Sequence, residues 1–199
     1  MGRHVFAIIG LWVSRKRDFY GMDFFGTIAH RHSYRGGFRD IPIPREDLKR
    51  IVEAGLLAPS AKNAQTTTFV IVDDPAKVAA IAAMPYNKAM TTAKAYIVCC
   101  VDRNPCAVYE GISFQIEDCA AAVENMLLAI TALGYATVWV DGWLRIENHA
   151  EIVAGLLGVP ENKQVRVILP IGVPEKEVVS RVVKKPFEER AWFNSYGHA

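Results

Sequence analysis

The feature that most constrains the fold is a long apolar segment, residues 113–133, with the periodicity of an α-helix. Apolar side chains recur every three or four positions, and small or apolar side chains also occupy the opposite side. The first set is Ile116, Cys119, Ala120, Val123, Leu127 and Ile130, and the second is Ala121, Ala122, Met126 and Ala129. A helix that is apolar on most sides is buried on most sides. We therefore expect other elements, or a second subunit, to cover it.

Shorter patterns predict the elements around this helix. Helices are expected over residues 24–29, 44–58, 76–84 and 148–157. Strands are expected over residues 69–72, 95–101, 135–140 and 164–171, the first two as buried strands. Because helices and strands mix without a strict βαβ repeat, the predicted fold class is α+β.

The helix expected over residues 44–58 has one apolar side. It begins at a proline, which suits a first turn, and stops before a second proline. The side expected to face the core consists of Leu48, Ile51, Val52, Gly55 and Leu56.

The composition is that of one globular domain. The chain has 199 residues, of which 51% are hydrophobic and 22% charged, which excludes disordered, collagen-like and coiled-coil classes. The formal net charge of +2 gives no case for nucleic acid as a partner. No apolar run reaches the roughly 18 residues of a membrane span, so no membrane partner is expected.

The basic residues are concentrated near the N-terminus, where the first fifty residues carry ten Lys or Arg against five Asp or Glu. The apolar run 5–13 has no small-residue cleavage site after it, so a signal peptide is not expected. Residues 22–25 look like a second natural start. We therefore expect residues 1–21 to form an N-terminal extension of unknown role, and residues 22–199 to form the functional domain.

The four cysteines are Cys99, Cys100, Cys106 and Cys119. None forms a CxxC pair and no histidine cluster lies near them, so neither a metal site nor a redox dithiol is predicted. Free cysteines suit a reducing compartment, and we expect the protein to be cytoplasmic.

Common catalytic signatures are absent from the sequence. The patterns GxGxxG, GxxxxGK[ST], GxSxG and HExxH do not occur. If the chain is an enzyme, a cofactor is expected to supply the difficult chemistry.

The first pattern with functional potential is the basic segment 31–35. In extended chain Arg31, Ser33 and Arg35 face one way and can converge on one ligand. Guanidinium offers a planar pair of donors for phosphate, and the serine hydroxyl adds another. The alternative is a basic loop that is only solvated.

Two further patterns are weaker. In the segment 58–65, Asn63 and Gln65 each carry a donor and an acceptor, although a turn that satisfies its own backbone explains them as well. In the segment 132–143, a strand leads to Asp141 and Gly142, and glycine there lets the backbone approach a flat ligand closely. An ordinary core strand is the alternative.

Together and in this order, the patterns resemble the FMN-dependent nitroreductase family. The carriers are MDFF…RHSYR (22–35), APSAKNAQ (58–65), NMLLA followed by ALG (125–134), and the last strand with the basic tail. The resemblance covers about residues 22–197. It implies an α+β fold with a mostly antiparallel central sheet flanked by helices, and an intertwined homodimer with FMN at its interface.

The resemblance also implies roles for individual residues around FMN. Arg31 and Ser33 would hold the phosphate, with Lys184 or Lys185 assisting from the tail. Arg35 would lie near the N1/C2 edge of the ring, and Asn63 would contact the ring with Gln65 beside it. The other matching cofactor positions are His32, Pro59, Ser60 and Val140.

The catalytic positions implied are Asp141 and Gly142, whose backbone N–H groups would face flavin N5, where hydride arrives and leaves. A fixed cation such as Arg35 near N1 would stabilise negative charge on the reduced ring. The implied reaction is a ping-pong cycle in which NADH or NADPH reduces FMN and a nitroaromatic, quinone or related small molecule then takes the electrons.

Three alternatives remain open. The chain could run a specialised flavin reaction, either flavin destruction or reductive dehalogenation. It could bind flavin without turnover, since Thr66, Thr67 and Thr68 stand where the family often has a proline and an aromatic residue. It could also be an α+β domain whose Arg31–Arg35 loop is merely solvated.

Overall fold

The computed structural model describes residues 23–179 and 182–197, so the expected extension 1–21 lies outside the described residues. The helices are α2 (Phe24–His30), α3 (Arg45–Leu56), α4 (Pro75–Ala82), α5 (Lys88–Thr92), α6 (Gln115–Ala132) and α7 (His149–Leu157). The strands are β1 (Thr68–Val72), β2 (Ala95–Asp102), β3 (Ala136–Thr137) and β4 (Lys163–Gly172). Three short 3-10 helices are η1 (Ala61–Asn63), η2 (Gly142–Arg145) and η3 (Phe187–Glu189).

The strands form one sheet in the order β1-β2-β4-β3, and all neighbours are antiparallel. Val98 of β2 lies opposite Val70 of β1 on one side and Ile168 of β4 on the other. The pairing of β2 with β4 shifts register between Cys99 and Cys100. This antiparallel sheet flanked by helices confirms the predicted α+β class.

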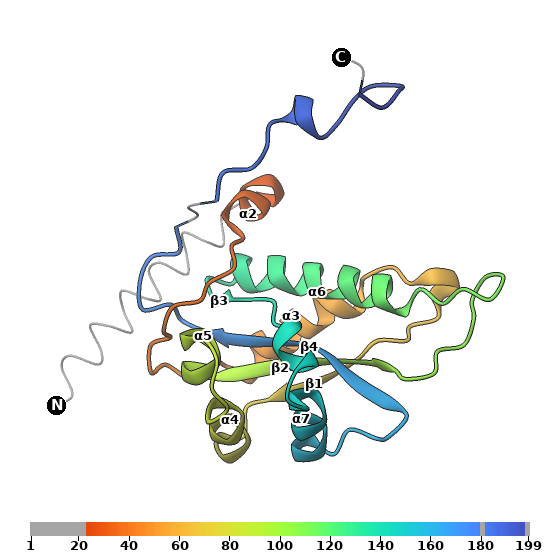
Figure 1. Cartoon of the computed structure of the whole chain (residues 1–199). Coiled ribbons are helices and arrows are strands. Elements are labelled where there is room, and N and C mark those ends of the chain that lie inside the picture. The colour runs from red at the N-terminus through yellow and green to blue at the C-terminus, as the bar shows by residue number, and fades with distance from the viewer. Residues whose placement is uncertain (1–22, 180–181, 198–199) are drawn as a thin grey trace.

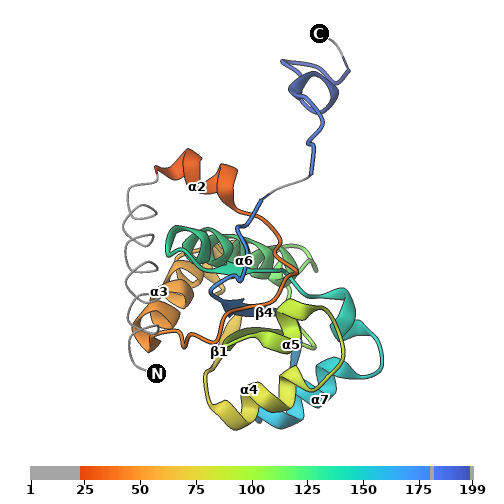
Figure 2. The same ribbon diagram turned by 90° about the vertical axis from the view of Figure 1, so that its left-hand side faces the viewer.

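Helices cover both faces of the sheet (Figures 1 and 2). On one face α3 and α6 pack over Ile97 and Cys99 of β2. On the other face α4, α5 and α7 enclose Val98 and Cys100. Successive residues of β2 point to opposite faces, so an uninterrupted apolar strand supplies both core layers.

The long helix predicted at 113–133 is α6, and it is largely buried as its pattern requires. Its fully buried residues include Cys119, Val123, Met126 and Ile130. Glu117 and Asp118 in its first turn suit the positive end of the helix dipole. Gly55 of α3 lies directly against Met126, which allows the two helices to pack closely.

Three sequence expectations need correction. β1 is an edge strand with only Val72 fully buried, because only β2 pairs with it. The strand expected over residues 135–140 is reduced to β3 and an isolated bridge from Val140 to Ile168. Leu56 is 63% exposed, because its position eight residues after Leu48 rotates it about 80° around the helix. The short helix α5 was not anticipated.

Two segments stand apart from the layered core. Helix α2 lies outside α6, and the tail 182–197 extends away from the sheet (Figures 1 and 2). Both segments expose large apolar side chains, including Phe25 at 79% and Phe193 at 80%. No helix within the described ranges has the length and apolarity to cross a membrane.

Candidate functional site

Two of the three patterns with functional potential lie along the same edge of the sheet, on the β3 side of β4. Ser33 forms a parallel bridge with Thr137, which lies opposite Ile171 of β4. Farther along, Val140 pairs with Ile168, and Asp141 is bonded to Arg166. The distance along β4 from Ile171 to Arg166 is roughly 17 Å. The basic segment and the Asp141–Gly142 turn therefore lie at opposite ends of one stretch of sheet edge.

In the basic segment, buried and exposed side chains alternate along the chain. Tyr34 is buried, its N–H donates to the Thr137 carbonyl at 2.8 Å, and its hydroxyl donates to the Gly37 carbonyl at 2.7 Å. Ser33 and Arg35 on either side are exposed, as alternation requires. Buried Thr137 Oγ1 beside them has no hydrogen-bond partner among residues 23–179 and 182–197.

Arg31 begins this segment as the residue that ends α2. Its Nε lies 3.3 Å from Oε1 of Glu124, a half-exposed residue of α6. His32 is half-buried next to it. The guanidinium is thus held against α6 by a carboxylate that is itself half-exposed.

The Asp141–Gly142 turn offers unused backbone donors. Within the described part of the chain, neither N–H of this pair donates a hydrogen bond. No atom lies within 4 Å of the position that a Cβ on Gly142 would occupy. The Asp141 backbone (φ −133°, ψ −53°) belongs to neither helix nor strand. The Cα of Gly142 is therefore open to the approach of a flat ligand, beside two N–H groups that have no partner within the described residues.

The carboxylate of Asp141 is the most heavily bonded polar group at this edge. Arg145 donates to it from Nε at 2.7 Å and from Nη2 at 2.9 Å. Arg166 donates from Nη1 at 2.6 Å. Hydrogen bonding to Asp141 raises the pKa of Arg145, because the bond favours the charged guanidinium. Sequence reasoning missed both arginines, although a charged residue inside the apolar run of β4 was a signal.

The third pattern lies at the start of α6. The N–H of Ala61 donates to Asp118 Oδ1 at 3.0 Å, and the N–H of Gln65 donates to Ser60 Oγ at 3.0 Å. Asn63 and Gln65 have positive φ angles of 56° and 49°. Such backbone strain in residues other than glycine concentrates at functional sites. The side chains of Asn63 and Gln65 are exposed, as is Pro59, and Ser60 is half-buried.

The tail lysines are not joined to the basic segment in the single chain. Lys184 and Lys185 are exposed, and Lys185 pairs with Glu189 at 3.2 Å. No hydrogen bond or ion pair within the described ranges links either lysine to Arg31 or Ser33.

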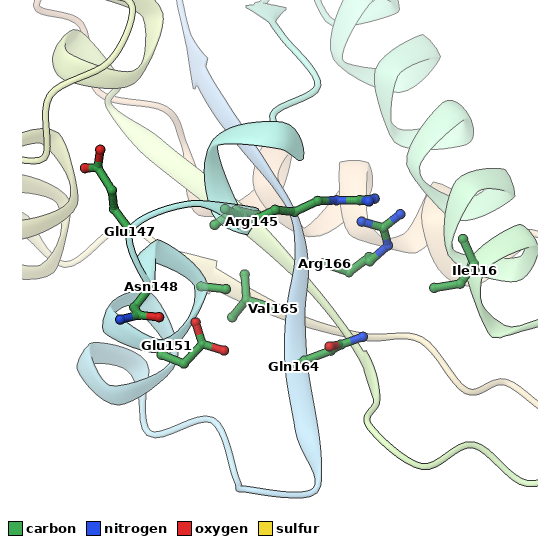
Figure 3. A pocket seen from close by; sticks show the side chains of 10 residues that line it. Ile116, Arg145, Glu147, Asn148, Glu151, Gln164, Val165 and Arg166 are labelled. Atoms are coloured by element: carbon green, nitrogen blue, oxygen red, sulfur yellow. The ribbon is translucent and has the colours of Figure 1, made fainter.

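An open pocket of about 510 Å³ lies between η2, β4 and α7. In Figure 3, Arg145 from η2 and Arg166 from β4 extend toward each other, and Ile116 of α6 faces them across the pocket. Glu147 and Glu151 line the side near α7. The pocket thus combines a few apolar side chains with guanidinium, amide and carboxylate groups.

Comparison with known proteins identifies the family. Residues 28–96 and 77–173 match the Nitroreductase family. A candidate NADH dehydrogenase/NAD(P)H nitroreductase of Archaeoglobus fulgidus is 35% identical over 141 residues, which cover 70% of this chain and 79% of that protein. An NADPH-flavin oxidoreductase of Vibrio harveyi is 30% identical over 159 residues, covering 75% of this chain and 64% of that one.

A solved structure of a nitroreductase has the same fold as this chain. The FMN-dependent nitroreductase of Clostridium difficile R20291 superposes with a TM-score of 0.72 at 26% identity. The match covers 87% of this chain and 100% of that one. The antiparallel sheet, the ordered patterns and these similarities agree, and the chain belongs to the nitroreductase family.

Proposed function

We propose that the chain is a homodimeric enzyme that uses NADH or NADPH to reduce nitroaromatic, quinone or related small-molecule acceptors by a ping-pong cycle. Family membership and the names of the relatives confirm the broader prediction of an NAD(P)H-dependent oxidoreductase with FMN as cofactor. The acceptor class, the order of steps and the residue roles are the proposal. The observation that carries the proposal is the arrangement of groups along the β3 side of β4. The unused N–H donors of Asp141 and Gly142 lie at one end of this edge, and Arg31 and Ser33 lie at the other.

The residues at this edge fit FMN. Arg31 and Ser33 supply a guanidinium and a hydroxyl for the phosphate, next to the unpartnered hydroxyl of Thr137. At the other end the free donors of Asp141 and Gly142 suit the N5 edge of a flat ring. The intervening length of strand suits an extended mononucleotide. Bound there, FMN would supply two-electron hydride chemistry.

Each protein group has a physical task in this proposal. Arg31 and Ser33 anchor the phosphate through charge-assisted hydrogen bonds. The N–H groups of Asp141 and Gly142 orient N5, and exposed Arg35 provides positive charge for the N1 edge. The pocket beside Arg166 is the space through which nicotinamide and acceptor reach the ring in turn.

A second copy of the chain completes the proposed site. In one chain the loop 59–65 contacts the first turn of α6, whereas Arg31 contacts the middle of that helix. Asn63 and Gln65 are exposed on a strained loop, and α2 and the tail expose large apolar side chains. We propose that dimerisation buries these surfaces and brings Asn63 and the tail lysines of one copy to the FMN of the other. The free buried thiols suit the proposed cytoplasmic location.

Steady-state kinetics test the reaction. Rates are measured with FMN-loaded protein while NADH or NADPH is varied at several concentrations of a quinone or a nitroaromatic acceptor. Parallel double-reciprocal lines are expected, because the donor leaves before the acceptor binds. Intersecting lines contradict the ping-pong order, and the absence of turnover with both donors and both acceptors contradicts the proposed reaction.

A further inference from the structure

We infer that Arg166 is a positioning residue that ties the Asp141–Gly142 turn to the sheet and thereby fixes the two backbone donors proposed for N5. This inference rests on the proposed function, because it concerns the same site. Arg166 itself is expected to act through the carboxylate of Asp141 rather than on the ring.

Few other hydrogen bonds attach the turn to the sheet. Val140, just before it, exchanges two backbone hydrogen bonds with Ile168, at 3.2 and 3.0 Å. After it, the N–H of Leu144 donates to the Asp141 carbonyl at 3.0 Å, a bond within the turn itself. The ladder therefore ends at Val140, and the side chain of Asp141 makes the next bond back to β4.

The two arginines that bind Asp141 differ in where they are anchored. Arg145 is four residues along, in η2, so it moves with the turn and makes a local bidentate pair. Arg166 is 25 residues away in β4. Its neighbours Val165 and Val167 are buried, and its own side chain is only 19% exposed. Of the two, only Arg166 connects the carboxylate to the rigid sheet.

Position matters here because hydride transfer requires a defined geometry. Misplacement of a reacting group by about 1 Å can cost roughly 100-fold in rate. The donors at Asp141 and Gly142 are backbone groups, so rotation of a side chain cannot reorient either of them. Their direction depends on the conformation of the turn, and hydrogen bonds to a carboxylate restrain that conformation more strongly than neutral ones.

The test compares Arg166→Ala, Asp141→Ala and the double variant in the FMN-loaded protein. Anaerobic stopped flow measures the rate constant for FMN reduction by NADH or NADPH, whichever reduces the parent faster. Each single change is expected to lower it about 10- to 100-fold. The double variant is expected to be no slower than the slower single variant, because both changes remove the same connection. Arg166→Met, which keeps the buried stem, serves if Arg166→Ala does not fold.

A second readout does not depend on turnover. Hydrogen exchange of the apoprotein is expected to accelerate in Arg166→Ala at the N–H groups of Val140 and Leu144, which are hydrogen-bonded on either side of the turn, while β2 exchange stays at the parent rate. Arg166→Lys keeps a cation that can donate a hydrogen bond. Its rate of FMN reduction and its exchange rate near the turn are therefore expected to lie between those of the parent and of Arg166→Ala. The matched control is Arg45→Ala, which removes another bidentate Arg–Asp pair, with Asp73, and should change neither readout.

The outcomes separate this inference from the proposed function. Parent-like reduction and exchange in Arg166→Ala, or fully additive losses in the double variant, overturn the positioning role. A parent protein that does not bind FMN, or whose FMN neither nicotinamide reduces, overturns the proposed function instead.

Discussion

At the scale of single residues, the two charged groups at the ends of the proposed cofactor site, Arg31 and Asp141, already have partners. Arg31 is paired with Glu124, and Asp141 is held by two arginines. Within the described part of the chain, the backbone donors of Asp141 and Gly142 and the buried Thr137 Oγ1 have no hydrogen-bond partner. An anion that binds at Arg31 therefore competes with Glu124. Breaking this exposed ion pair costs little free energy, because water solvates the released carboxylate.

Replacement of Arg31 is expected to weaken FMN binding. A hydrogen bond to a charged group contributes about 1.5–3 kcal/mol, so Arg31→Ala should raise the Kd roughly 10- to 100-fold. Quenching of flavin fluorescence measures the Kd. Glu124→Gln removes the competing carboxylate and should tighten binding. Unchanged affinity in Arg31→Ala would favour the merely solvated basic loop.

Cysteine reactivity is expected to be confined to one residue. Burial raises the pKa of the Cys100 thiol to about 11, and Cys99 and Cys119 are almost fully buried. Because alkylation needs a thiolate that the reagent can reach, only exposed Cys106 should be alkylated in the native protein. Mass spectrometry should find one label per native chain and four after unfolding. Early labelling of Cys119 would show that the α6 layer opens without global unfolding.

At the scale of elements, the contact between β4 and the segment after the basic residues is tight. A Cβ on Gly172 would lie within 2.6 Å of two Phe38 side-chain atoms, Cβ and Cγ. Phe38 in turn pairs with Pro174, so this contact holds the chain that leads from Arg35 back to the sheet. The element that presents the phosphate-binding residues is thus fixed by close packing as well as by the Ser33–Thr137 bridge.

A pair of glycine substitutions tests this packing. Gly172→Ala should destabilise the fold by about 1–3 kcal/mol, because Phe38 must shift. Gly155→Ala, on the exposed side of α7 where no atom lies within 4 Å, should instead stabilise it by about 0.5–1 kcal/mol. Urea unfolding measures both. Equal effects of the two substitutions would contradict the tight contact at Gly172.

The elements also show how far the sequence determines the fold and the site. Periodicity identified α6 and the centres of β2 and β4, because burial on both sides leaves a long apolar pattern. It failed for Leu56, where the helix turns the side chain outward, and for the short β3, where pairing depends on a distant strand. The Arg166–Asp141 contact joins residues 25 positions apart, so no local pattern reveals it.

At the scale of the whole molecule, the exposed apolar side chains call for a partner. Phe24, Phe25, Phe193 and Tyr196 are each at least 65% exposed, all on segments outside the layered core. Such exposure is costly in water and typical of a surface that another chain covers. The proposed dimer accounts for these residues and for the basic tail together.

Light scattering on the eluting protein should therefore give twice the 22.1 kDa mass of one chain. A paired substitution, Phe24→Ser with Phe25→Ser, should shift the mass toward one chain and weaken FMN binding, because the proposed site needs both copies. A monomeric parent that binds FMN tightly would contradict the shared site.

The most direct measurement of the central claim is an anaerobic titration of the FMN-loaded protein with NADH and with NADPH, followed at the flavin absorption band. At least one of the two should bleach the band with one equivalent per bound FMN, and a quinone or nitroaromatic acceptor should restore it. A chain that takes up no FMN, or whose bound FMN stays oxidised with both nicotinamides, would contradict the account.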